Sequence, residues 1–303
     1  MSIVHEPHVS YGSVTVHASE HAGPVLGKSA VLADYVEVMA DLDIARPDDA
    51  RALTVKVIPS TAPHLLVHYR TAFTLTRQFG SRSLSRSDCR HFATTLQTGV
   101  VIARPRGPLG TICINLRPEA AASLLGERMQ CFLDAEIGLD AIFGASQISL
   151  LEERLTTANT SAERFACMES FLAANLREPR ANPVACRAAA LLRQNPNLRV
   201  RHLAARLDVS QRHLGRSFQA MFGMTPKEFA RIARIETVWP AWRQGASWAD
   251  VAYATGFADQ AHMIHDFTDI VGLPPARLVR PPATETPLPA NMSKGIKTPR
   301  RTA

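Results

Sequence analysis

One segment near residue 210 carries side chains suited to reading the edges of DNA bases. Gln211, Arg212 and Arg216 fall on one face if the segment is helical, and His213 lies near them. Arg donates paired hydrogen bonds to guanine O6 and N7, and Gln pairs with adenine N6 and N7. Ser210 precedes them and is a residue type that favours the first position of a helix. The same side chains could also solvate a helix surface, so the DNA interpretation depends on what surrounds them.

A second basic group follows at helical spacing. Lys227, Arg231 and Arg234 are four and three residues apart, which predicts a basic edge suited to phosphates. The charge of the whole chain is concentrated here. Residues 187–235 hold 10 Lys or Arg against 2 Asp or Glu, whereas the chain as a whole has a net charge of +7. A basic block of this kind indicates attraction to a polyanion, and double-stranded DNA is the expected partner.

An internal repeat places these residues in context. Residues 203–226 resemble residues 251–275, with one extra residue in the turn of the second copy. Each copy predicts a short helix (200–207 or 248–254), a turn and a second helix that begins behind a small polar cap, Ser210 or Asp259. Asp208 and Gly256 stand in the turns, where the left-handed conformation is tolerated. The repeat therefore predicts two helix-turn-helix units.

The second copy differs from the first in charge. Its second helix carries Asp259, Asp266 and Asp269 and has no Lys or Arg, so phosphates should be repelled. Its candidate base readers are Gln260, His262 and His265. A zinc site formed by the two histidines would need a partner motif that is not evident. We expect the first unit to dominate DNA affinity.

These residues resemble the DNA-binding domain of the AraC/XylS transcription regulators. The resemblance covers residues 199–279 and is carried by SQRHLGRSFQAMFGMTPKEFARIARIE, GFADQAHMIHDF and GLPP. It implies seven helices, two helix-turn-helix units joined by a long helix, and binding in successive major grooves on one face of DNA. It also implies that Ser210, Gln211, Arg212, His213 and Arg216 lie on the first recognition helix, and Gln260, His262 and His265 on the second.

Two residues depart from the family pattern. The family often has Arg where this chain has His265, which weakens that predicted contact. Pro240 falls within the joining helix, and an interior proline removes a helix hydrogen bond. We therefore expect the joining helix to kink or to end near Val238.

The N-terminal half is predicted to be β-rich. Gly, Pro and Ser separate short apolar runs, which favours an antiparallel sheet or small barrel. The predicted strands are residues 53–60, 64–71, 73–80, 94–104 and 111–117, followed by helices at 118–125, 147–158 and 162–176, the last behind Ser161. The fold class is therefore α+β. We expect a sensor or dimerisation domain over residues 1–180, a DNA-binding domain over 184–280 and a disordered tail over 281–303.

Other functions are less consistent with the sequence. His64, His68 and His91 suggest a cupin-like, metal-dependent enzyme fused to a DNA-binding module, but the remaining cupin ligands are not evident. The five cysteines are scattered, which argues against a disulfide framework, a zinc site or a methyl-accepting cysteine cluster. We predict no catalytic residue, no metal and no cofactor.

The remaining expectations concern location and partners. The sequence shows neither a signal peptide nor an apolar run of membrane-spanning length, so we expect a cytoplasmic bacterial regulator. The expected partners are double-stranded DNA, a small-molecule effector, a second copy of the chain, and RNA polymerase if the protein activates transcription.

Overall fold

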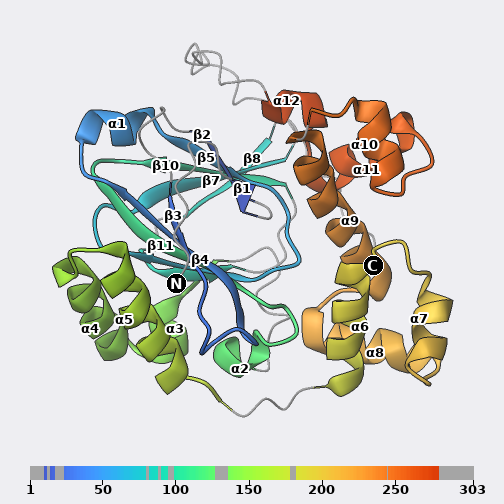
Figure 1. The fold of residues 1–303 in the computed structure, drawn as a ribbon, viewed down its shortest axis with the longest axis horizontal. Helices are drawn as coiled ribbons and strands as arrows, with labels where there is room; N and C mark the ends of the chain where they lie inside the picture. Colours follow the sequence, from blue (N-terminus) through green and yellow to red (C-terminus); the bar gives the residue numbers. More distant parts are fainter. Residues whose placement is uncertain are drawn as a thin grey trace, which may run out of the picture.

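The computed structural model combines a β-rich N-terminal region with a helical C-terminal region (Figure 1). It describes residues 10–11, 14–17, 24–79, 82–87, 90–94, 99–126, 136–177, 182–243 and 245–279. The predicted α+β class is confirmed. The predicted tail at 281–303 lies outside the described residues.

Two six-stranded sheets form the N-terminal region, and the strand pairs within each are antiparallel. In spatial order, the first contains β1 (Ser10–Tyr11), β2 (Val14–His17), β5 (Thr54–Val57), β10 (Val100–Pro105), β7 (Phe73–Phe79) and β8 (Arg82–Ser87). The second contains β12 (Glu136–Gly138), β9 (Phe92–Thr94), β6 (His64–His68), β11 (Leu109–Leu116), β4 (Val36–Ile44) and β3 (Val25–Gly27). Each of the five predicted ranges contains a strand, with shifted bounds, and the long β4 was not predicted.

The second sheet has two different faces because side chains alternate along its strands. On β11, Thr111, Cys113 and Asn115 face a cavity between the sheets, whereas Ile112 and Ile114 enter a core shared with helices. This alternation places one face of the second sheet against the helices and leaves the other toward the first sheet.

Short helices complete the N-terminal region: α1 (Pro47–Ala52), α2 (Ala122–Leu125), α3 (Leu139–Phe143), α4 (Ala145–Thr157) and α5 (Ser161–Ala174). Figure 1 shows α3, α4 and α5 grouped beside β4. The prediction of Ser161 as the helix cap was off by one residue. Thr160 caps α5 instead, because its hydroxyl accepts from the backbone of Glu163 while the Glu163 carboxylate reaches back in a capping box.

A buried ion pair attaches α5 to the sheet. Arg164 donates to Asp41 of β4 at 2.9 Å, and the Tyr69 hydroxyl donates to the same carboxylate at 2.6 Å. The Arg164 guanidinium also lies over the Tyr69 ring, 4.4 Å from its centre. These contacts compensate the desolvation of the Asp41 charge.

The C-terminal region is helical throughout its described part. Its elements are α6 (Pro183–Gln194), α7 (Val200–Arg206), α8 (Gln211–Phe222), α9 (Pro226–Arg243), α10 (Trp248–Ala254), α11 (Gln260–Val271) and α12 (Pro275–Val279). In Figure 1 the long α9 joins a lower group, α6 to α8, to an upper group, α10 to α12. The seven helices agree with the expected arrangement of two units and a joining helix.

None of the described helices is both long enough and apolar enough to cross a membrane.

Candidate nucleic-acid interface

The first helix-turn-helix unit consists of α7 and α8. Asp208 in the turn has a φ of 54°, and Ser210 caps α8 by accepting a hydrogen bond from the His213 backbone at 3.1 Å. Leu214 and Phe218 are fully buried one turn apart. This inward pair fixes the rotation of α8, so the opposite side of the helix faces solvent.

The outward side of α8 carries the predicted base readers. Gln211, Arg212, His213 and Arg216 are all exposed. The side chain of Gln219 instead donates to the carbonyl of Gly223 at 2.6 Å, and the left-handed backbone of Gly223 ends the helix. The predicted base readers thus lie in the N-terminal half of α8, the part of a recognition helix that contacts base edges.

The second unit, α10 and α11, repeats this construction. Gly256 in its turn has a φ of 77°, and Asp259 caps α11 by accepting from the His262 backbone at 2.7 Å. Met263 and Phe267 are fully buried. The predicted readers Gln260, His262 and His265 are exposed on the other side.

The turn of the second unit packs against the loop before α7 and against the joining helix. Asn197, in the loop before α7, lies against Gly256 of the second unit so closely that a side chain at Gly256 would collide with it. Arg234 of α9 lies over the Phe257 ring at 4.4 Å from its centre and donates to Asn197 at 3.4 Å. The turn of the second unit is therefore held by residues of the first unit and of the joining helix.

A polar groove of about 560 Å³ lies at this junction. Lys227, Arg231 and Arg234 of α9 line it together with Arg199, which precedes α7, and His262 of α11. The groove thus brings the predicted phosphate contacts beside a predicted base reader of the second unit. A basic groove next to two exposed recognition helices suits a DNA backbone.

The partner of these arginines is Asp266, which was not predicted from the sequence. Arg231 donates to Asp266 at 2.5 and 2.9 Å, and Arg234 donates to the other Asp266 oxygen at 3.0 Å. The Asp266 carboxylate is nearly buried and raises the pKa of Arg231 through hydrogen bonding. Asp266 therefore neutralises the joining helix instead of adding negative charge to the outward face of α11. Its position in the sequence was a usable signal, because it lies three residues after Met263 and directly before Phe267, within the inward stripe.

The joining helix does not end where the sequence analysis expected. α9 continues through Pro240 to Arg243, so of the two alternatives, a kink or an end near Val238, the end is wrong. Packing explains the continuation, since Val238 is buried in the helical core and Trp242 stacks on Trp248 at a ring distance of 5.5 Å. These contacts hold the last turn although Pro240 has no N–H to donate.

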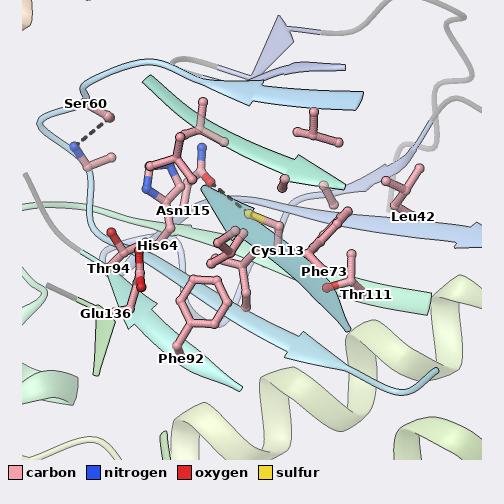
Figure 2. A pocket seen from close by; sticks show the side chains of 18 of the residues that line it. Leu42, Ser60, His64, Phe73, Phe92, Thr94, Thr111, Cys113, Asn115 and Glu136 are labelled. Carbon is pink, nitrogen blue, oxygen red and sulfur yellow. Dashed lines mark hydrogen bonds between the residues drawn. The ribbon is translucent and has the colours of Figure 1, made fainter. Parts of the chain in front are cut away.

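A separate cavity of about 90 Å³ lies between the two sheets of the N-terminal region. Aliphatic and aromatic side chains from both sheets form most of its wall. Figure 2 shows Leu42, Phe73 and Thr111 toward one end of the cavity. Toward the other end it shows Ser60, His64, Thr94, Asn115 and Glu136. Burial lowers the pKa of His64 to about 4, so its imidazole is neutral near pH 7. The cavity is therefore an apolar space with an uncharged histidine in its wall.

The histidines of the alternative enzyme interpretation do not gather around one point. His64 lines the cavity, whereas the His68 ring packs edge-on against Phe73, and His91 pairs with Glu152 at 2.9 Å. Within the ranges that the structure describes, no three His, Cys, Asp or Glu side chains are arranged to hold a metal ion.

Comparison with known proteins identifies the C-terminal region. Residues 203–280 match a family described as a helix-turn-helix domain. A comparison with curated protein sequences finds no match.

Several solved structures are similar to this chain. ToxT from Vibrio cholerae shares 12% identity over 79% of this chain and 96% of its own, with a TM-score of 0.44. The AraC-like transcriptional activator CuxR shares 14% over 80% and 91%, with a TM-score of 0.33. The C-terminal domain of AraT, a response regulator from Geobacillus stearothermophilus, shares 20% over 35% and 93%, with a TM-score of 0.32.

Proposed function

We propose that this chain, whose C-terminal region is an AraC-type helix-turn-helix domain, is a sequence-specific DNA-binding transcription regulator. The observation that carries the proposal is the arrangement of α8 and α11. Both present exposed polar side chains, and the basic groove lined by Lys227 and Arg199 lies at the junction of their units. The proposal is that the two helices enter successive major grooves.

The first unit provides most of the binding free energy in this proposal. Arg212 and Arg216 are exposed on α8, which has no acidic residue. On α11, Asp269 is exposed and lies near His265, at 3.7 Å from its Nδ1. α11 therefore contributes selectivity more than attraction to phosphate.

The N-terminal region is the proposed sensor. Its cavity of about 90 Å³ has an apolar wall and a polar end, which suits a largely apolar effector smaller than benzene that accepts or donates one or two hydrogen bonds. The neutral state of His64 favours an uncharged polar group over a carboxylate group.

Selection of DNA fragments from a random pool by the full chain, followed by affinity measurements on the selected fragment, tests the proposal. Arg212→Ala combined with Arg216→Ala should reduce specific affinity at least about 30-fold without changing the fold, since each bidentate base contact provides about 1–3 kcal/mol. Arg46→Ala with Arg51→Ala is the matched control, because it removes the same charge from exposed positions of the N-terminal region. Unchanged affinity in the first pair, or an equal loss in both pairs, would contradict the assignment of α8.

A further inference from the structure

The joining helix is attached to the N-terminal region through one carboxylate. Glu236 of α9 accepts hydrogen bonds from the loop between β5 and β6, 175 residues earlier in the chain. The Ser60 hydroxyl donates to its Oε1 at 2.5 Å, the Thr61 backbone to the same oxygen at 3.0 Å, and the Thr61 hydroxyl to Oε2 at 2.7 Å. Both carboxylate oxygens are therefore occupied by donors from the other region.

This contact is poorly solvated. Desolvation raises the pKa of Glu236, and the hydrogen bonds from Ser60 and Thr61 oppose that rise. Ser60 and Thr61 are themselves buried. A buried carboxylate that loses its donors is costly, so the loop and the helix depend on each other.

Other contacts also join the N-terminal region to the C-terminal helices. The Gly99 backbone donates to the Ile270 carbonyl of α11 at 3.0 Å, and Arg193 of α6 forms an ion pair with Glu37 of β4. Ile58 and Val100 of the N-terminal region belong to the hydrophobic core of the C-terminal helices. The N-terminal region thus contacts α6 and α11 as well as the joining helix α9.

The loop that holds Glu236 is also a wall of the cavity. Ile58, Ser60 and Ala62 all line it, and the Ser60 hydroxyl accepts from the Ala62 backbone at 3.0 Å (Figure 2). A ligand or side chain that moves this wall would therefore also move the donor to Glu236.

The joining helix is weakest at the same place. Pro240 cannot donate the hydrogen bond that the Glu236 carbonyl would receive in an unbroken helix. The N-terminal region thus contacts α9 at Glu236, where the hydrogen bonding within the helix is interrupted. If the contact at Glu236 is lost, we expect the following turn of α9, toward the second unit, to become less ordered.

From these contacts we infer that Glu236 is a coupling residue. Through it the N-terminal region binds α9, and we call the hydrogen bonds from Ser60 and Thr61 to Glu236 the hold. A displacement of the cavity wall at Ser60 changes the geometry of the hold. The effect of the hold on DNA binding rests on the proposed function. The existence of the hold does not depend on that proposal. In the held arrangement Arg212, Arg216 and His262 remain exposed, so holding orders the two units without covering them.

Amide hydrogen exchange in the full chain, without DNA, tests the hold. Thr61 and Gly99 each donate a backbone hydrogen bond across the contact, but only Thr61 touches Glu236. In Glu236→Ala, both amides should exchange at least tenfold faster, because loss of the hold opens the whole contact. Glu236→Gln keeps one oxygen acceptor and should show a smaller acceleration at both amides.

Glu228→Gln is the matched control. It removes a carboxylate charge from the same helix, where the carboxylate accepts only from Thr225 among the described contacts. It should leave the exchange of Gly99 unchanged. Acceleration at Thr61 alone in the Glu236 variants would overturn the inference, because Glu236 would then only cap a loop.

A separate variant tests whether the cavity and the hold are linked. Ala103→Leu places a larger side chain in the cavity wall on β10, away from Glu236, and should change Thr61 exchange at least threefold. Unchanged exchange would show that the cavity is not linked to the hold.

DNA binding tests the consequence of the hold. Glu236→Ala should weaken binding to the selected fragment several-fold, because the units must be ordered on binding. A wild-type chain that selects no fragment would contradict the proposed function and leave the exchange result standing.

Discussion

Arg231 and Asp266 form an ion pair that joins the two halves of the DNA-binding domain. The Arg231 guanidinium approaches Asp266 Oδ1 to 2.5 Å, and Arg234 occupies the other oxygen. Arg231 is one-third exposed, whereas Asp266 is nearly buried. The pair therefore positions α11 against α9. It also neutralises part of the positive charge of Arg231, a residue that was predicted from the sequence to contact phosphates.

Asp266→Asn should separate these two effects. Loss of the charge-assisted hydrogen bonds should lower the free energy of unfolding of the C-terminal domain by about 2 kcal/mol. The freed charges of Arg231 and Arg234 should raise non-specific DNA affinity severalfold at low salt, measurable by fluorescence anisotropy. Asp269→Asn, which changes an exposed residue, is the comparison and should cost less stability. A variant that loses stability without gaining affinity would show that the arginines do not reach DNA.

The helix-turn-helix units could be predicted from sequence because their determinants are local. Caps such as Ser210 and Asp259, the turn residues and the inward pairs all lie within about a dozen residues, and the structure confirms them. The boundary of α9 could not be predicted in this way. Propensity penalises Pro240, but packing of Val238 and Trp242 decides the outcome.

The long-range relationships had no local signal. Ser60 and Glu236 are polar residues in unremarkable surroundings in the sequence, and only the fold brings them together. The cavity likewise requires two sheets whose strands are interleaved in sequence. A strand prediction gives the alternation of Thr111, Cys113 and Asn115, but it does not show what that face meets.

Lys227 and Arg231 should differ in their contribution to DNA binding. Lys227 is exposed in the groove, whereas Arg231 is engaged with Asp266. Lys227→Ala should weaken binding to all sequences alike and reduce the slope of log affinity against log salt by about 1. Arg231→Ala should reduce thermal stability more than it reduces that slope. Equal slopes for the wild type and Lys227→Ala would remove Lys227 from the interface.

Two glycines of the domain should respond to alanine in opposite directions. Gly256 has a left-handed φ of 77°, and a side chain there meets Asn197, so Gly256→Ala should cost at least about 1–2 kcal/mol. Gly215 lies within α8, and a Cβ there meets nothing within 4 Å. Gly215→Ala should therefore stabilise the domain by up to about 1 kcal/mol through helix propensity.

Urea unfolding of both variants measures the difference. Gly256→Ala combined with Asn197→Ala separates the two causes, because it relieves the collision and keeps the backbone strain. Gly256→Ala with wild-type stability would contradict the packing of the two units at this turn.

The buried histidines predict that the N-terminal region is sensitive to acid. Burial lowers the pKa of His68 to about 3 and that of His64 to about 4, against an ordinary value of 6.5. Below pH 6.5 the unfolded chain takes up protons that the folded chain refuses, so stability present at neutral pH is lost as the pH falls. For His68 alone the loss at pH 5 is about 2 kcal/mol.

His68→Leu tests this assignment. Neither ring nitrogen of His68 has a hydrogen-bond partner within the described part of the chain, so leucine should cost little at pH 7.5. At pH 5 the variant should be more stable than the wild type by about 2 kcal/mol. Parallel stability curves for the two proteins between pH 7.5 and pH 5 would show that His68 is protonated in the folded state.

The cavity between the sheets should bind a small apolar probe. Its volume of about 90 Å³ is below the roughly 150 Å³ of a cavity that holds benzene, but it exceeds the space that one xenon atom needs. We therefore expect a bound xenon resonance in 129Xe NMR and no saturable binding of benzene. Ala103→Leu should abolish the xenon signal, since the leucine side chain occupies that space, whereas Ala220→Leu on the exposed side of α8 should retain it. A wild-type protein without the xenon signal would show that the cavity is filled or closed in solution, and the effector would then have to bind elsewhere.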